Sequence, residues 1–427
     1  MNIINLKSVD EKVYHETLEN GLEVYVLRKK DFKTCSAQFI TKFGGIDLEF
    51  VPINEDKMVK FPAGIAHFLE HKLFEQEKGE SVSDFFKKSG VSFNATTNEF
   101  RTRFYFSGIK NFKENLNFLI DFVQSPYFTD ENVLKEKGII KEEILMCKDN
   151  PQRRLYETKM HNLFNEYPFD NTVVGEIEDI NKITKEDLYR CYNTFYHPSN
   201  MCLVVVSNLD EKEIIKLIRE NQEKKDYKKE LNIVRKEYNE SDNIRKDYEV
   251  IYDKVSETRV CYSLKFKKEY FGYSKTKTLM SLFILFDILI GELSEFSLKL
   301  KEEEKVIGNI GFSVEYVYDY LIVSFVARPN NEDEYIKLLE NQINEKNINK
   351  EDFEMIKKSI ISSDLFNYNN VESTISSLCN DYMLYGNISN KPIEDEKNLS
   401  YEEFMDVVNK FNTKNKSIVV LRPNEKE

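Results

Sequence analysis

Two of the chain's five histidines lie four residues apart, in the segment GIAHFLEHKLFE that runs from Gly64 to Glu75. Residues at i and i+4 share one face of a helix, so His67 and His71 can direct both imidazoles at one point. Glu70, three residues after His67, lies on nearly the same face. Two imidazoles and a carboxylate at this spacing predict a metal site that carries its own base.

Metal-assisted hydrolysis is the chemistry that this pattern permits. A catalytic zinc takes three protein ligands and leaves its fourth position to water. The metal lowers the pKa of that water to about 7, so that a neighbouring carboxylate can accept its proton. An H-x-x-E-H helix supplies two ligands and the base, in the reverse order of H-E-x-x-H. An amphipathic helix with a polar cluster and no metal is the alternative interpretation.

The motif lacks a third ligand, and the best candidate is a carboxylate on a second helix. The segment KEKGIIKEEILMCKDNP places Glu136 and Glu143 two helical turns apart on one face, with Glu142 rotated off that face. Exposed glutamates on a charged helix would show the same spacing, so the residues alone leave both interpretations open. His197 precedes a proline, which favours a turn role over metal binding. The remaining histidines are His15 and His161.

A sheet must position these helices. The run VSFNATT, which ends at Thr97, is followed by a turn and by FRTRFYF, in which Phe100 to Phe106 alternate in character. Such alternation indicates a strand with one buried face. Hairpins that are joined by helical segments indicate a mainly antiparallel sheet with helices packed on one side.

The chain repeats this pattern. Its 427 residues are too many for one compact core, and a shift of 220 positions lays Tyr105 on Phe325 and Thr129 on Asn349. We therefore predict an α+β fold with two homologous domains, residues 1–227 and 228–427, and a solvated, charged linker over residues 220–249. In this alignment Glu136 and Glu143 fall on Ile356 and Ser363, so the second half lacks a comparable metal set.

Composition excludes several classes of partner. The net charge of −13 comes from 61 basic and 74 acidic residues without a basic block, which argues against nucleic acid. The apolar run from Leu279 to Gly291 is shorter than the roughly 20 residues of a membrane helix and contains Asp287, so we expect a buried helix and no membrane. Six scattered cysteines and the absence of an early apolar run predict a cytoplasmic protein.

GIAHFLEHKLFE, followed about seventy residues later by GIIKEEILMCKDNP, resembles the pitrilysin/insulinase family of zinc peptidases, the inverzincins. The resemblance covers nearly all of the first half, and the second half by length and pattern. The chain is similar to bacterial members of processing-peptidase size, which have two homologous domains per chain and pair with a second chain. Further stretches that carry the resemblance are ENGLEVYVL from Glu19, SGVSFNATT up to Thr97, SPYFTDENVLKEKGII from Ser125 and FYHPSNM from Phe195.

The resemblance implies a role for each candidate residue. His67 and His71 become ligands of one Zn²⁺ per chain, with Glu143 as the third ligand. Glu70 becomes the general base, and Glu136 an assisting carboxylate that orients a ligand.

The family binds its substrate as a strand added to a sheet edge, which recognises the peptide backbone. Here the matching strand contains Asn94 and Ala95, although an ordinary hairpin strand would look the same. The family also holds the substrate carbonyl with an arginine and a tyrosine of the second domain. This chain has Glu295 at the arginine position and Gly308 near the tyrosine. Because losing an oxyanion donor costs about 10² to 10³ in rate, we expect a homologous partner subunit without the zinc motif to supply this pair.

The leading hypothesis is a zinc-dependent endopeptidase subunit that acts on peptides or unfolded segments as half of a heterodimer. A non-catalytic structural or binding subunit of a processing-peptidase-like complex is the main alternative. A purely structural zinc site is a third possibility, but such sites are usually rich in cysteine, and none lies near the motif.

Overall fold

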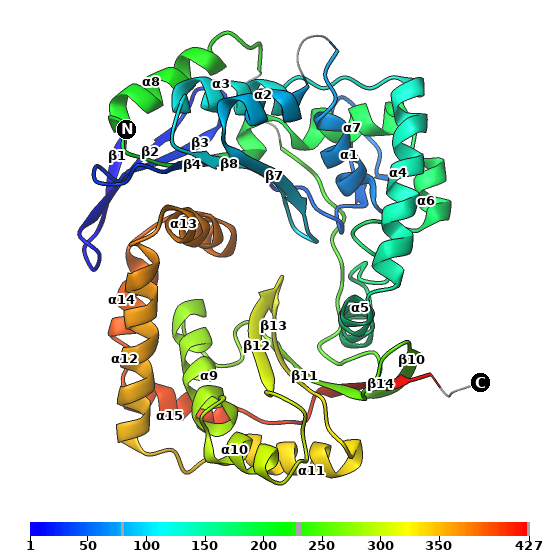
Figure 1. Cartoon of the computed structure of the whole chain (residues 1–427), viewed down its shortest axis with the longest axis vertical. Helices are drawn as coiled ribbons and strands as arrows, with labels where there is room; N and C mark the ends of the chain where they lie inside the picture. Colours follow the sequence, from blue (N-terminus) through cyan, green and yellow to red (C-terminus); the bar gives the residue numbers. More distant parts are fainter. Residues whose placement is uncertain (78–80, 228–231, 425–427) are drawn as a thin grey trace. The chain divides into compact units, whose positions relative to one another are not determined.

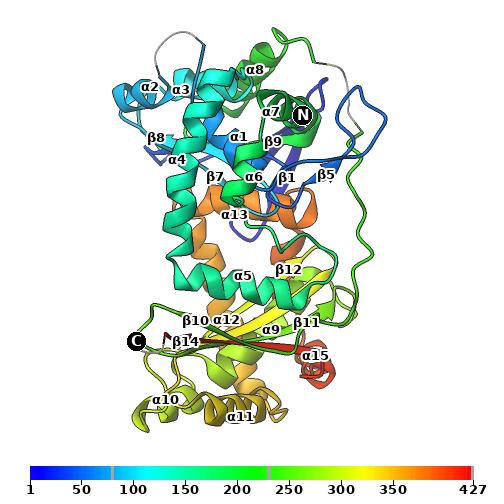
Figure 2. The same ribbon diagram turned by 90° about the vertical axis from the view of Figure 1, so that its right-hand side faces the viewer.

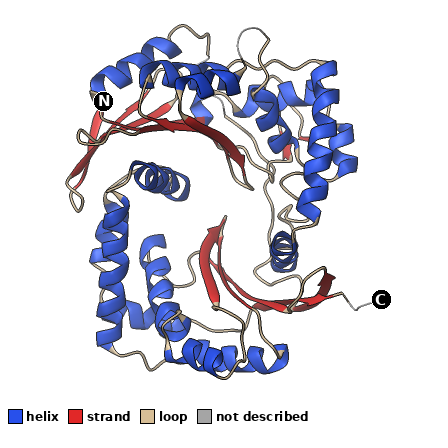
Figure 3. Cartoon of the chain, viewed as in Figure 1, coloured by secondary structure: helices blue, strands red, loops and turns tan. Residues whose placement is uncertain are grey.

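The structure is a computed structural model that describes residues 1–77, 81–227 and 232–424. It divides into two compact units, each built from one large sheet and several helices (Figures 1 to 3). Unit 1 comprises residues 1–147, 171–237 and 365–390, and unit 2 comprises residues 148–170, 238–364 and 391–427. The predicted α+β architecture with two sheet-and-helix bodies is confirmed.

Unit 1 contains a seven-stranded sheet in the order β1-β2-β3-β9-β4-β8-β7. Only the pairing of β3 with β9 is parallel among the described strands of this sheet. Strand β7 forms one edge, which matters for the site described below. The strands are β1 (Asn2–Leu6), β2 (Glu11–Thr17), β3 (Glu23–Arg28), β4 (Cys35–Thr41), β7 (Ser92–Thr97), β8 (Thr102–Gly108) and β9 (Met201–Ser207), and a separate ribbon holds β5 (Glu49–Phe50) and β6 (Val59–Lys60).

Most helices of unit 1 cover one face of this sheet, where Phe39, Phe104 and Phe106 join the main apolar core. One further helix, α13 (Val371–Tyr385), contacts β4 and β9 on the opposite face (Figure 1). The other helices are α1 (Ile65–Leu73), α2 (Val82–Ser89), α3 (Phe112–Val123), α4 (Asp130–Lys148), α6 (Ile177–Lys182), α7 (Lys185–Phe195) and α8 (Glu211–Gln222), with a 3-10 turn η1 (Pro198–Asn200).

Unit 2 contains a five-stranded sheet in the order β10-β14-β11-β13-β12. Its main helical layer includes the apolar run, which forms the buried helix α9, and helix α5 contacts β11 and β14 on the other face (Figure 3). The strands are β10 (Tyr248–Asp253), β11 (Arg259–Lys267), β12 (Gly311–Val317), β13 (Tyr320–Ala327) and β14 (Lys416–Pro423). The helices are α5 (Pro151–Leu163), α9 (Lys275–Ile290), α10 (Glu295–Glu302), α11 (Glu332–Ile343), α12 (Lys350–Asn367), α14 (Lys391–Lys397) and α15 (Tyr401–Lys410).

Equivalent helices of the two halves begin 220 residues apart, as 112 and 332, 130 and 350, and 151 and 371. The last pair, α5 and α13, is exchanged, since each packs on the sheet formed mainly by the other half of the sequence. The prediction that helices cover only one side of each sheet missed this pair. Strands β4 and β9 are buried along their whole length, as expected of strands that are covered on both faces. The domain boundary after residue 227 stays a prediction about the sequence repeat.

The charged stretch at residues 220–249 differs from the predicted solvated linker. Residues 228–231 lie outside the described residues, but three side chains after them make specific contacts with the folded units. Ile233 packs against the core of unit 1, Arg235 Nε donates to Asp47 Oδ1 at 2.7 Å, and the Glu240 side chain is 2% exposed. The high average charge of the stretch concealed these individual contacts. Among the described residues, no helix combines the length and the apolar character that crossing a bilayer requires.

Candidate metal centre

Helix α1 holds the H-x-x-E-H motif in a rigid position. It begins after Gly64, whose φ of 82° is left-handed, and a Cβ at this residue would lie 2.5 Å from the carbonyl oxygen of Val174. Glycine is therefore required for the helix to start here. The apolar side of α1 is fully buried through Ile65, Phe68 and Leu69. The helix packs against β7 and α7, so its polar side is fixed relative to the sheet.

His67, His71 and Glu143 are brought together, with one ligand atom from each residue within 4.8 Å of the others. His67 Nε2 lies 3.4 Å from Glu143 Oε1, and His71 Nε2 lies 3.4 Å from Glu143 Oε2. Ligands at 2.0–2.2 Å from a tetrahedral zinc are separated by about 3.3–3.6 Å. The donor types fit a zinc ion, and both imidazole–carboxylate separations fall within this range. In the described part of the chain, no other group of three such side chains is comparably close.

Glu136 contacts the far side of one imidazole. His71 Nδ1 lies 3.0 Å from Glu136 Oε1, and donation from Nδ1 leaves the Nε2 lone pair free for a metal. Helix α4 thus supplies both carboxylates and contacts α1 through them; both helices are labelled in Figure 1. The two glutamates that share a face in the sequence take different positions: Glu143 faces both Nε2 atoms and Glu136 faces a single Nδ1.

The second imidazole lacks such support. His67 Nδ1 is buried and has no hydrogen-bond partner among the described residues. Packing, with 7% of the residue exposed, fixes this ring instead. Of the two imidazole rings, only that of His71 is therefore oriented by a hydrogen bond to Nδ1, and Glu136 makes that bond.

Glu136→Ala is expected to weaken zinc binding about 10- to 100-fold, because loss of an outer carboxylate frees the ligand that it orients. Competition titration with a chromophoric chelator measures this. Glu142→Ala is the matched control, since Glu142 lies on the same helix and is exposed. Equal zinc affinity in Glu136→Ala and the control would refute the orienting role.

Glu70 lies beside the metal set and is not one of its three members. The residue is 8% exposed, and its Oε2 accepts a hydrogen bond of 2.5 Å from Thr97 Oγ1 at the end of β7. Burial raises the pKa of the Glu70 carboxyl. A carboxylate with a raised pKa is a stronger base near neutral pH, which is what a proton acceptor at this position requires.

In the metal-free protein, the neighbouring carboxylates favour the protonated form of His71. Burial opposes protonation of His71, but hydrogen bonds with Glu136 and Glu143 raise the pKa of His71 to about 9. Hydrogen bonds from His67 and His71 hold the pKa of Glu143 well below its usual range. A divalent cation would replace this proton, so the charge pattern is complementary to a metal.

The remaining histidines lie outside the metal set. His15 pairs with Glu23, His161 pairs with Asp170, and His197 accepts a hydrogen bond from the backbone of Ser199 in a turn. The turn interpretation of His197 agrees with this geometry.

Asn94 and Ala95 lie on the edge strand β7. The backbone N–H of Ala95 donates to the Asn94 side chain at 2.9 Å. Ala95 is buried and joins the apolar core, whereas Asn94 is exposed. Their role in binding substrate stays a prediction.

Sequence reasoning missed two contacts of the site. Thr97 holds Glu70, and Lys72, which is fully buried, pairs with Glu75 and lies 3.9 Å from Glu136 Oε2. The only signal for Lys72 was its place directly after His71, within a turn of the ligands. For Thr97 the sequence offered no signal, because the contact joins a strand to a helix.

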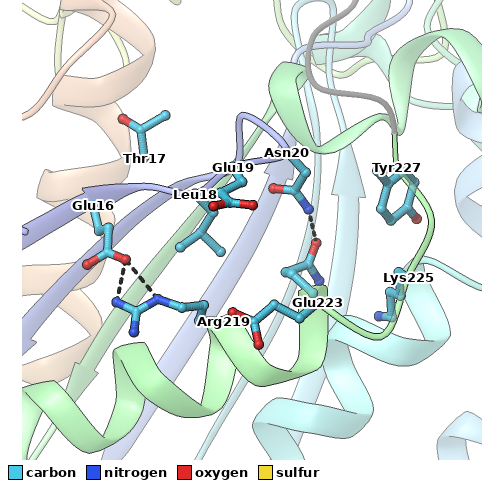
Figure 4. Close-up of a pocket in the computed structure, with 10 residues that line it drawn as sticks. Glu16, Thr17, Leu18, Glu19, Asn20, Arg219, Glu223, Lys225 and Tyr227 are labelled. Carbon is cyan, nitrogen blue, oxygen red and sulfur yellow. Dashed lines mark hydrogen bonds and ion pairs between the residues drawn. The ribbon is translucent and has the colours of Figure 1, made fainter.

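A separate pocket of about 620 Å³ opens between the β2–β3 turn and α8 of unit 1 (Figure 4). Its polar walls already pair with one another: Glu16 accepts from Arg219 at 2.6 Å, and Asn20 donates to Gln222 at 2.9 Å. The pocket contains no residue of the metal set.

Two family models and several known proteins match the chain. Residues 59–176 match the family model described as insulinase (peptidase family M16), and residues 182–360 match the peptidase M16 inactive domain. A Bacillus subtilis relative, the uncharacterized zinc protease YmfH, is 42% identical over 323 residues, which is 75% of each chain.

Solved structures show the same fold. An M16-like peptidase from Alicyclobacillus acidocaldarius has a TM-score of 0.89 and 28% identity, and the match covers 97% of this chain and 99% of that one. A protease from Helicobacter pylori shares the fold with a TM-score of 0.83, 20% identity and coverage of 97% and 100%. These matches confirm the resemblance to the insulinase family, and the chain belongs to peptidase family M16.

Proposed function

We propose that this protein is the zinc-bearing subunit of an endopeptidase that hydrolyses peptides or unfolded polypeptide segments. The observation that carries the proposal is the convergence of two imidazole Nε2 atoms on Glu143, 3.4 Å away in each case, with Glu70 beside them. Membership in family M16 and relatives that are called zinc proteases support it.

Each residue has a distinct task in this proposal. His67, His71 and Glu143 would hold Zn²⁺, one per chain, and Glu136 would keep the His71 ring in place. When bound, zinc lowers the pKa of water to about 7 and polarises a peptide carbonyl. Glu70 accepts a proton from the attacking water and passes it to the leaving amine.

The peptide would bind as an added strand along β7, with contacts to Asn94 and Ala95. Strand β7 supports this because it is a sheet edge that ends at Thr97, the residue that holds Glu70. Recognition of the backbone would select for length and flexibility in the substrate more than for side chains.

A homologous partner subunit completes the proposal. Glu295, the first residue of α10, occupies the expected arginine position, and Gly308 lies near the expected tyrosine position. Neither side chain can donate the hydrogen bonds that would stabilise the oxyanion. We place the heterodimer in the cytoplasm because the six cysteines are scattered along the sequence without the spacing of a disulfide framework.

The alternative is a non-catalytic subunit. The match of residues 182–360 to a domain described as inactive is the observation that favours it. All of the proposed metal residues fall within the other match, residues 59–176. The alternative therefore does not explain why a complete ligand set and a buried base are present.

Cleavage of a library of unstructured peptides tests the proposal, with the protein alone and with its co-purified partner. We expect cleavage that a zinc chelator abolishes and that an equimolar amount of zinc restores, with faster turnover in the complex. Cleavage that resists chelation would contradict the zinc mechanism. A zinc-loaded complex that cleaves no peptide would favour the non-catalytic subunit.

A further inference from the structure

Two arginines lie beside the edge strand β7, on the sheet face that points away from the main core. Strand β8 alternates, and its core-facing residues Thr102, Phe104 and Phe106 are buried. Arg101 and Arg103 belong to the opposite set and are both partly exposed. Figure 1 shows β7 at the end of the sheet, with α13 on the face away from α2 and α3.

Arg103 reaches across to the edge strand. It is directly opposite Thr96 of β7 in the sheet register, and its Nε donates to Thr96 Oγ1 at 2.8 Å. The guanidinium also lies over the ring of Tyr105, 5.1 Å from the ring centre. These contacts hold the charge against β7 and leave donors of the guanidinium unused.

Neither arginine has a carboxylate partner among the described residues. Arg101 donates to the neutral amide oxygen of Asn380, on α13, at 3.2 Å. By contrast, nine of the chain's twelve arginines pair with a carboxylate within 4.0 Å. In a chain with net charge −13, unpaired neighbouring guanidiniums are an exception.

The pair carries an electrostatic cost that an anion would relieve. Partial burial, and then the charge of Arg103, lower the pKa of Arg101. A bound carboxylate would offset both effects, because a guanidinium matches a carboxylate with two parallel N–H donors.

The arginine pair and the metal site contact successive residues of β7, on opposite faces of the sheet. Thr96, which Arg103 contacts, adjoins Thr97, which donates to Glu70 at 2.5 Å. Side chains of a strand added to β7 would alternate between the two faces of the sheet, at about 3.3 Å per residue. A side chain that faces the arginines would therefore lie within about two residues of a bond that is held at the metal.

We propose that Arg101 and Arg103 bind a carboxylate of the peptide and make the site prefer substrates with an acidic group within about two residues of the cleaved bond. The carboxylate comes from an aspartate or glutamate side chain or from the peptide's own C-terminus. This inference rests on the proposed function, because it concerns a peptide bound along β7.

Matched peptides test the inference in two ways. One series is amidated and carries Glu, Gln or Lys at each position in turn around the cleaved bond, and one further Gln peptide has a free C-terminal carboxylate. Binding to the zinc-loaded Glu70→Gln protein is measured by fluorescence anisotropy. Cleavage is measured with the protein that retains Glu70. Both use the complex with the partner subunit.

At one of the positions we expect the Glu peptide to bind about tenfold more tightly than the Gln peptide, as one charge-assisted contact provides. KM should change, with kcat little affected. Arg103→Gln should remove the preference, Arg103→Lys should restore part of it, and Arg103→Glu should favour the Lys peptide. Arg219→Gln is the control, since Arg219 pairs with Glu16, and it should retain the preference.

Tighter binding of the peptide with the free C-terminus than of any peptide with an internal Glu would identify the terminal carboxylate as the ligand. Cleavage of all peptides without regard to charge would overturn the inference while leaving the proposed function intact. The same holds if the preference survives in the double variant Arg101→Gln/Arg103→Gln. Failure to bind or cleave any peptide would instead refute the proposed function and the inference with it.

Discussion

Glu70→Gln is expected to abolish peptide hydrolysis while the protein keeps its zinc. The substitution preserves shape and a hydrogen-bond acceptor for Thr97, but an amide cannot accept a proton. General acid–base catalysis contributes about 10² to 10⁴ in rate, and Glu70 would serve both in activating water and in protonating the leaving amine. We therefore expect a loss of at least about 10³-fold in kcat.

Single-turnover kinetics with one peptide, together with metal analysis, measures this effect. Glu142→Gln is the matched control, because Glu142 is exposed on α4 and should leave both quantities unchanged. If the zinc-loaded Glu70→Gln protein hydrolyses the peptide at close to the unsubstituted rate, Glu70 is not the base.

Lys265→Met is expected to lower the free energy of unfolding by about 3–5 kcal/mol, the usual consequence of breaking one side of a buried ion pair. The Lys265 and Glu240 side chains are 0% and 2% exposed. Lys265 Nζ donates to Glu240 Oε1 at 2.7 Å, and to the carbonyl oxygens of Leu163 and Ser241 at 2.9 Å and 2.8 Å. Methionine fills the space but removes the positive charge and all three of these hydrogen bonds.

The destabilisation would come mainly from the buried negative charge of Glu240, which would lack a cationic partner. That carboxylate also accepts backbone N–H groups of Asn165, Glu166 and Tyr167, so it fastens the loop after α5 to the sheet of unit 2. The double variant Lys265→Met/Glu240→Gln should recover part of the loss.

Urea unfolding measures the effect, with Lys267→Met as the control. Lys267 forms a salt bridge with Asp242, in which both side chains are more than half exposed, and such pairs contribute about 0–1 kcal/mol. Equal midpoints for Lys265→Met and Lys267→Met would show that the buried pair does not stabilise the unit.

Short-range periodicity made much of the site predictable. The i, i+3 and i+4 spacing on α1 and the two-turn spacing on α4 follow from helix geometry, so the sequence and the resemblance could propose His67, Glu70, His71, Glu136 and Glu143 as site residues. Spacing by itself did not distinguish the position of Glu143, at both imidazoles, from that of Glu136 behind one of them.

Contacts between distant segments were not predictable. The side chain of Thr97 reaches Glu70 only because β7 packs against α1, and Arg103 approaches the same strand only through the sheet register. Glu240 resembled its solvated neighbours in a charged stretch, yet it is a buried anchor. The exchange of α5 and α13 likewise depends on packing between segments far apart in the chain.

The zinc content of three purified proteins tests the central claim most directly: the unsubstituted chain, Glu143→Gln and Glu142→Gln. The two substitutions are chemically identical and lie on adjacent residues of α4, but only Glu143 faces His67 and His71. We predict one zinc per chain in the unsubstituted and Glu142→Gln proteins. After dialysis, Glu143→Gln should hold less than about a tenth of that amount, because a metal site that loses one of its ligands loses most of its affinity for the metal. Full zinc occupancy in Glu143→Gln, or none in the unsubstituted protein, would contradict the account.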